Sequence, residues 1–225
     1  MNATLSKYEC LVFDCDGVIL DSNRIKTDAF YRAALDYGKD PATKLVEFHV
    51  ANGGISRYKK FEHFFRDILN RTSWDSELEV VLENYANFVR DGLLTCAIAP
   101  GLEKLREITA DSRWLIVSGG DQAELGDVFM ARGLTEYFDG GIFGSPTPKD
   151  VILEREIERQ NIQKPALFIG DSRFDHQCAA AAGLDFVFLS AWSEFKEWSA
   201  YFSDKKIVIQ DSIESLLNTQ IAGQA

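Results

Sequence analysis

The sequence predicts an α/β fold built on a parallel sheet with an inserted helical module, and three observations lead to this prediction. Apolar runs too short for helices end in polar residues after Phe13, at Ser118 and after Gly170. From about Ile98 onward such runs alternate with helical patterns, as they do where helices join the strands of a parallel sheet. Before that point the pattern is helical for a long stretch without an intervening strand.

The helical stretch predicts a separate module of residues 20–95 inserted into a core of residues 1–19 and 96–225. Asp21-Ser22 and Asp91-Gly92 are the expected hinge positions. Apolar residues recur at helical spacing in three stripes, which are Ile25, Ala29, Ala33 and Tyr37; Tyr58, Phe61, Phe65 and Ile68; and Leu78, Val81, Leu82, Tyr85, Phe88 and Val89.

Composition and charge narrow the class of protein. A chain of 225 residues with 46% hydrophobic residues can fill a sizeable core. Its net charge of -11 argues against nucleic-acid binding, which needs a basic face, and favours small diffusible partners. The four cysteines have no metal-ligand spacing. We expect neither a signal peptide nor a membrane span, and hence a cytoplasmic protein that is a monomer or a weak homodimer.

The first apolar run, Tyr8–Phe13, is followed by two carboxylates and a glycine. Asp14 and Asp16 alternate around one residue, so the strand end and the following turn can direct both toward one small volume above the sheet edge. Two such charges repel unless a cation lies between them, and Mg²⁺ prefers carboxylate and carbonyl oxygens. A single strand-end aspartate often only caps a helix, but the whole string argues for a metal site.

Three later segments place further polar groups at the same expected edge. Ser118 and Gly119 end a strand and precede a helix, where a hydroxyl and backbone N–H groups can bind phosphate oxygens, although such serines are also common helix caps. Lys149 begins a helix after two prolines, a position that the helix dipole disfavours unless an anion is near. Asp171 ends a strand, and Asp175 returns to the same side one helical turn later.

A glycine-rich loop at positions 52–60 brings cations into the helical module. Its paired glycines allow the backbone to approach a ligand closely, and Arg57 is a candidate for binding an acidic or phosphorylated substrate. A solvated helix face is the simpler interpretation for Lys59 and Lys60, and for Arg57 both interpretations stay open. The three histidines have no partner at metal spacing and are interpreted as ordinary polar or packing residues.

The stretch Phe13-Asp14-Cys15-Asp16-Gly17-Val18-Ile19-Leu20-Asp21-Ser22 closely resembles the first motif of the haloacid dehalogenase superfamily of hydrolases, in its phosphoglycolate phosphatase-like branch. Ser118, Lys149 and the Gly170-Asp171…Asp175 pattern resemble the second, third and fourth motifs, in the expected order. Many relatives carry the motif lysine earlier in the loop, where this chain has Ser145. The resemblance implies a three-layer, Rossmann-like sheet with a helical cap and a site at the carboxyl ends of the strands.

The resemblance also implies an enzyme that hydrolyses a small phosphorylated metabolite with Mg²⁺ as cofactor, through an aspartyl-phosphate. An acid such as Asp16 is needed for an alcohol leaving group but not for a halide, which favours phosphoryl chemistry over dehalogenation. Together the residues and the resemblance assign catalytic roles to Asp14, Asp16 and Lys149, metal ligation to Asp14, Asp16 and Asp171, a supporting place beside the metal to Asp175, and substrate binding to Ser118, Gly119 and Arg57.

Two other functions remain open from the sequence. A phosphomutase of the same fold, similar to β-phosphoglucomutase, would need the cap to hold a sugar phosphate for return transfer. A non-catalytic phospho-acceptor or binding module, like a response-regulator receiver, would also phosphorylate a strand-end aspartate. The inserted cap argues against the receiver, which has no use for a lid that excludes water.

Overall fold

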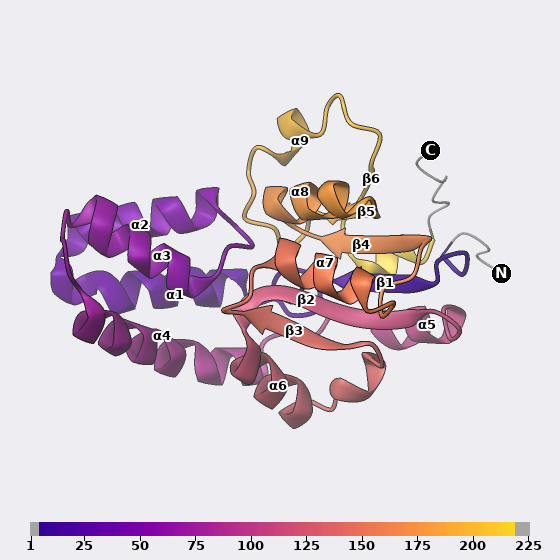
Figure 1. The fold of residues 1–225 in the computed structure, drawn as a ribbon, viewed down its shortest axis with the longest axis horizontal. Helices are drawn as coiled ribbons and strands as arrows, with labels where there is room; N and C mark the ends of the chain where they lie inside the picture. The colour runs from indigo at the N-terminus through magenta and orange to yellow at the C-terminus, as the bar shows by residue number, and fades with distance from the viewer. Residues whose placement is uncertain (1–4, 219–225) are drawn as a thin grey trace.

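The computed structural model describes residues 5–218 and contains a six-stranded sheet in which all strands are parallel (Figure 1). The strands are β1 (Cys10–Phe13), β2 (Arg113–Asp121), β3 (Gly141–Ser145), β4 (Ala166–Gly170), β5 (Asp185–Leu189) and β6 (Val208–Gln210). Their order is β3-β2-β1-β4-β5-β6, so β1 lies between β2 and β4. The expected Rossmann-like α/β sheet is confirmed.

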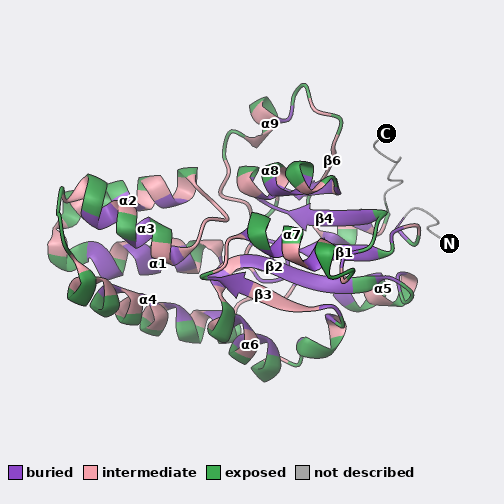
Figure 2. Cartoon of the chain, in the orientation of Figure 1, coloured by how far each residue is buried: buried purple, intermediate pink, exposed green. Residues whose placement is uncertain are grey.

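Most residues of β1, β2 and β4 are buried (Figure 2), and alternate residues of each strand face opposite sides of the sheet and meet different helices. Leu11 and Phe13 belong to the core under α5 (Leu102–Ile108), α6 (Gln122–Ala131) and α10 (Ile213–Leu216). Cys10 and Val12 belong to the core under α7 (Lys149–Glu158), α8 (Arg173–Ala182) and α9 (Trp198–Tyr201). The strands read as continuous apolar runs because both of their faces are covered.

Of the five helices that lie between β1 and β2 in the chain, the first four project beyond one end of the sheet (Figure 1). They are α1 (Asn23–Ala34), α2 (Lys39–Ala51), α3 (Arg57–His63) and α4 (Asp75–Thr95), with single turns at Leu35–Tyr37 and Phe64–Ile68; a further short turn, Thr135–Tyr137, precedes β3. The rings of Phe30, Phe61 and Tyr85 pack together at their centre, with centroids 4.4 to 5.9 Å apart. Within residues 5–218, no helix combines the length and the apolar character needed to cross a membrane.

Both connections to this helical segment leave the sheet at one place. The amide of Asp21 donates to the carbonyl of Ala97 at 3.0 Å, and the amide of Ala99 donates to the carbonyl of Ile19 at 2.9 Å. The expectation of a hinge at Asp91-Gly92 is wrong, because both residues lie inside α4. A Cβ at Gly92 would lie 2.6 Å from a methyl carbon of Ile25, so this glycine lets α1 and α4 pack closely instead of ending a helix.

Candidate active site

Acidic side chains from neighbouring strands meet at the carboxyl edge of the sheet. Asp14 directly follows β1 and Asp171 directly follows β4, and the two strands pair in register with Phe13 opposite Ile169. Asp175 lies in the first turn of α8. All three carboxylates are buried, and each offers an oxygen within 4.8 Å of the others. The in-register parallel pairing therefore brings together residues more than 150 positions apart.

Lys149 joins two of these carboxylates from the start of α7. Its Nζ lies 2.7 Å from Oδ2 of Asp14 and 2.5 Å from Oδ1 of Asp175, and its side chain is 1% exposed. Burial alone would lower the pKa of Lys149, but the two carboxylates outweigh it and raise that pKa. The lysine is therefore an ammonium group held against Asp14.

Asp175 uses both of its oxygens within the protein. Oδ1 accepts from Lys149, and Oδ2 accepts from the hydroxyl of Ser172 at 2.6 Å and from its amide at 3.1 Å. The amide of Asp175 donates in return to the Ser172 hydroxyl, which completes a capping box at the start of α8. Asp175 is thus placed to orient Lys149.

Asp14 and Asp171 lack enough positive charge around them. Burial is the main cause that raises the pKa of Asp14 to about 7, and Asp175 and Asp16 raise it further while Lys149 lowers it. Burial, then Asp14 and Asp175, raises the pKa of Asp171 well above its usual range. A divalent cation would remove this deficit, and a set of oxygen donors suits Mg²⁺. The residues present therefore fit the metal that the sequence predicts.

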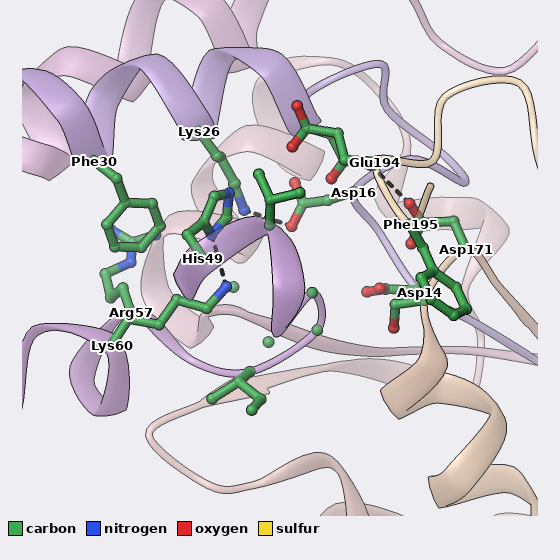
Figure 3. Close-up of a pocket in the computed structure, with 18 of the residues that line it drawn as sticks. Asp14, Asp16, Lys26, Phe30, His49, Arg57, Lys60, Asp171, Glu194 and Phe195 are labelled. Atoms are coloured by element: carbon green, nitrogen blue, oxygen red, sulfur yellow. Dashed lines mark hydrogen bonds and ion pairs between the residues drawn. The ribbon is translucent and has the colours of Figure 1, made fainter. Parts of the chain in front are cut away.

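The carboxylate of Asp16 turns away from this cluster. Its Oδ1 accepts from the hydroxyl of Ser22 at 2.6 Å, and its Oδ2 lies 2.5 Å from Nζ of Lys26 (Figure 3). Burial opposes ionisation, but Lys26 and then Ser22 outweigh it and lower the pKa of Asp16. Asp16 is therefore held ionised beside the cluster, and ligation of a metal by this residue stays a prediction.

Glycine is required at the turn that follows these aspartates. Gly17 has a φ of +73°, and a Cβ there would lie 2.2 Å from Oδ2 of Asp171. The same Oδ2 accepts a hydrogen bond from the side-chain Nδ2 of Asn23 at 2.7 Å. The turn after β1 and the first residue of α1 thus fix the position of Asp171.

A pocket lies between the acidic cluster and the helical segment (Figure 3). Gly119 and the paired glycines Gly53 and Gly54 line it, and a Cβ at Gly119 would lie 2.3 Å from the carbonyl oxygen of Gly54. The glycine loop therefore closes directly onto the end of β2. Ser118 is fully buried within β2, which continues three residues further than the sequence predicts, to Asp121, and the Ser118 hydroxyl accepts from the amide of Gly120 at 3.0 Å.

Arg57 lines the pocket, but its guanidinium is already bound to other groups of the protein. Both terminal nitrogens of Arg57 bind the carboxylate of Glu124 on α6, and the guanidinium lies 4.6 Å from the centre of the Tyr85 ring. The neighbouring Tyr58 donates from its hydroxyl to Asp121 at 2.7 Å. These contacts join α3 to the α/β part, and a contact of Arg57 with substrate stays a prediction.

Sequence reasoning missed several pocket residues. Lys60 is 2% exposed and lines the pocket, so its interpretation as part of a solvated face is wrong, whereas Lys59 is exposed as expected. His49 and Lys26 also line the pocket and are buried. Lys60 directly precedes the buried Phe61, but no charge or spacing rule separates it from its exposed neighbour.

A model of the haloacid dehalogenase-like hydrolase family matches residues 8–183, whereas no curated protein sequence gives a significant match. Three similar solved structures resemble the fold at low sequence identity. A predicted phosphoglycolate phosphatase from Haemophilus somnus is 16% identical with a TM-score of 0.71, covering 94% of this chain and 97% of that one. A predicted phosphatase from Clostridium acetobutylicum is 17% identical with a TM-score of 0.70, covering 94% and 97%. A β-phosphoglucomutase from Clostridium difficile is 20% identical with a TM-score of 0.70, covering 92% of each chain.

These structures share the fold across nearly the full length of the chain. The family match spans β1 through α8 and so includes Asp14, Lys149, Asp171 and Asp175. The chain therefore belongs to the haloacid dehalogenase-like hydrolases.

Proposed function

We propose that this hydrolase is a Mg²⁺-dependent phosphatase that hydrolyses a small phosphorylated metabolite through an aspartyl-phosphate intermediate. The observation that carries the proposal is the placement of Lys149 between Asp14 and Asp175, with Asp171 beside them, at the buried carboxyl edge of the sheet. A carboxylate nucleophile can approach an anionic phosphoryl group only where cations offset the repulsion.

The chain's own residues account for most of the chemistry. Asp14 attacks phosphorus in line with the departing alcohol, so that the new bond forms to a carboxylate oxygen as the ester bond breaks. Lys149 steadies Asp14 and the transferred phosphoryl oxygens. Ser118 and the amide of Gly119, at the end of β2, are candidates to donate to the same oxygens.

Asp16 moves the protons. It gives one to the leaving alcohol and later takes one from the water that hydrolyses the aspartyl-phosphate. Because Lys26 holds Asp16 ionised in the present geometry, the arrangement suits the second half of this cycle. The first half requires that substrate binding weaken the contact with Lys26.

Mg²⁺ would be held by the carboxylates of Asp14 and Asp171 and by the backbone carbonyl of Asp16. When bound, it supplies positive charge that brings the phosphoryl group and the nucleophile together. Asn23 orients Asp171 for this role through its hydrogen bond of 2.7 Å.

Residues 20–95 would act as the cap that closes over the substrate and excludes bulk water. The pocket beneath has a volume of about 70 Å³ and is lined on one side by Asp14 and on the other by residues of the helical segment, which supports a small substrate held between the two parts. One of the structures with the same fold is a β-phosphoglucomutase, so a mutase is the second candidate, and the assay must follow the fate of the phosphoryl group.

The test measures release of inorganic phosphate from p-nitrophenyl phosphate and from a panel of phosphorylated sugars, acids and nucleotides. We expect sustained release with Mg²⁺ and none in excess chelator. Asp14→Asn should abolish turnover because an amide is a poor nucleophile, whereas Asp28→Asn, an exposed aspartate on α1, is the matched control and should retain it. Sustained release by Asp14→Asn would refute the proposal, and isomerisation of a sugar phosphate with little net release would replace it with the mutase.

A further inference from the structure

One buried cation in the pocket has no carboxylate partner among residues 5–218. Lys26 is paired with Asp16, and Arg57 is paired with Glu124. Lys60, on α3, lines the same pocket and is 2% exposed, yet its hydrogen-bond partner is a histidine nitrogen. A buried ammonium group without an anion is costly to the protein unless a ligand supplies one.

Lys60 is the end of a chain of hydrogen bonds that crosses from the α/β part into the helical segment. Its Nζ lies 2.7 Å from Nδ1 of His49 on α2, and Nε2 of His49 lies 3.0 Å from Oγ1 of Thr27 on α1. The hydroxyl of Thr27 donates at 2.6 Å to Oε2 of Glu194, which follows β5. Lys60 and His49 lie on the side of the pocket opposite Asp14 (Figure 3).

The donor and the acceptor of each hydrogen bond in this series can be assigned in only one consistent way. A carboxylate only accepts, so the single hydroxyl proton of Thr27 goes to Glu194. Thr27 must then accept from Nε2–H of His49, which leaves a lone pair on Nδ1 to accept from Lys60. Burial, with Lys60 and Lys26 nearby, lowers the pKa of His49 well below its usual range and so keeps the ring in this neutral form.

This assignment leaves N–H donors of Lys60 free to bind a ligand. Burial lowers the pKa of Lys60 to about 7, and in its protonated form, which an anionic ligand favours, the group has three N–H donors, of which His49 uses one. The Nζ of Lys60 also lies 5.5 Å from the centre of the Phe30 ring, a contact that uses no further N–H donor in a hydrogen bond. The remaining donors need oxygen acceptors, and the pocket is where a substrate would bring them.

We propose that Lys60 is a specificity-determining residue that binds an oxygen atom on the alcohol part of the phosphoester, and that Glu194, Thr27 and His49 position it. This inference rests on the proposed phosphatase activity. The phosphoryl group would occupy the end of the pocket at Asp14, so Lys60 meets the part of the substrate that leaves. The expected substrates carry a carboxylate or a hydroxyl beyond the ester oxygen, and alcohols without such an oxygen are poor substrates.

A matched series of two-carbon esters tests the inference: ethyl phosphate, 2-hydroxyethyl phosphate and carboxymethyl phosphate. Lys60→Met keeps the length and the apolar stem of the side chain but removes its donors. It should lower kcat/KM about tenfold to a hundredfold for an ester that carries the distal oxygen and leave ethyl phosphate nearly unchanged. A loss confined to carboxymethyl phosphate identifies a carboxylate as the group bound, and a loss on 2-hydroxyethyl phosphate identifies a hydroxyl.

The positioning residues have their own readout. Thr27→Val removes the hydroxyl while keeping the shape, and should weaken the same esters selectively, whereas Thr27→Ser should restore the preference. Lys59→Met, the exposed neighbour on α3, is the matched control for loss of a lysine charge and should behave like the wild type. Thermal unfolding checks that Lys60→Met folds, as is expected when an apolar residue replaces a buried charge.

Binding separates this inference from the proposed function. Calorimetric titration of the three esters into Asp14→Asn with Mg²⁺ measures discrimination without turnover. Weaker binding of the oxygen-bearing ester to Asp14→Asn/Lys60→Met than to Asp14→Asn supports the role of Lys60. Equal affinities, or an equal loss on all three esters, would overturn it. Failure of the wild type to hydrolyse any phosphoester would instead overturn the phosphatase assignment.

Discussion

Replacement of Lys149 by methionine should reveal how strongly the buried carboxylates depend on this cation. The substitution removes contacts of 2.7 Å to Asp14 and 2.5 Å to Asp175, whose side chains are 5% and 0% exposed. Asp171 lies in the same cluster. Breaking a buried ion pair by removing one partner costs about 3–5 kcal/mol, because the other charge stays buried without compensation. We expect a loss of stability in this range above neutral pH, together with loss of activity.

The chain offers a matched control on its surface. Lys104 and Glu107 form an ion pair of similar length, 2.6 Å, but their side chains are 64% and 63% exposed. An exposed pair contributes about 1 kcal/mol or less because water and salt screen it. Lys104→Met should therefore change the free energy of unfolding little, although the ion pair that it breaks is as short as those of Lys149.

Urea unfolding followed by tryptophan fluorescence measures both variants, and Trp114, fully buried in β2, reports on the sheet. The destabilisation by Lys149→Met should shrink as the pH falls from about 9 toward 7. Burial raises the pKa of Asp14 to about 7 even with the lysine present, and loss of the lysine raises it further, so folded Lys149→Met takes up this proton at a pH where the wild type is still ionised and no longer needs the cation. Equal losses in the two variants, or a loss that grows on acidification, would refute this reasoning.

Three further outcomes are expected. Gly17→Ala forces a Cβ to within 2.2 Å of Oδ2 of Asp171 at a φ of +73°, and should lower kcat/KM for p-nitrophenyl phosphate about a hundredfold; a wild-type rate would contradict the tight packing at this turn. Arg57→Ala should lower kcat/KM for the native substrate about tenfold to a hundredfold. Glu124→Ala, measured in the same kinetic assay, should lower kcat/KM equally only if Arg57 acts by joining α3 to α6 and not by binding substrate. Burial lowers the pKa of Lys60 to about 7, so the unfolded chain binds a proton that the folded chain lacks between pH 7 and about 10. Stability measured by urea unfolding should rise over that interval in the wild type relative to Lys60→Met, and a constant difference would count against the pKa.

The sequence predicts the cluster of carboxylates in the site because the parallel arrangement of the strands is enough to bring these residues together. Asp14 and Asp171 follow apolar strands, and parallel strands bring their carboxyl ends to one edge whatever lies between them. Lys149 could be predicted because a cation at a helix start needs an anion nearby. These inferences need only local pattern and chain direction.

The residues on the cap side of the site could not be predicted from the sequence, because long-range contacts place them and no local sequence pattern contains such contacts. Lys60 and Lys59 are adjacent on one helix, and only packing against α1 and α2 decides that one is buried and the other exposed. The partner of Arg57 lies 67 positions away on α6. Helix α2 lies within the predicted helical module, but none of the three apolar stripes marks it, because polar residues dilute the helical spacing of Ala42, Leu45 and His49.

The pairing of residues 19–21 with residues 97–99 makes the helical segment exchangeable. Its two ends leave the sheet side by side, so the register of β1 against β2 does not depend on what the chain does between them. The boundary of the exchangeable part lies after Lys26, since Asn23 and Lys26 already hold Asp171 and Asp16. Substitution or replacement of the later helices could thus change which alcohol is accepted while the chemistry at the sheet edge stays the same, which would let this architecture acquire new substrates without rebuilding its nucleophile.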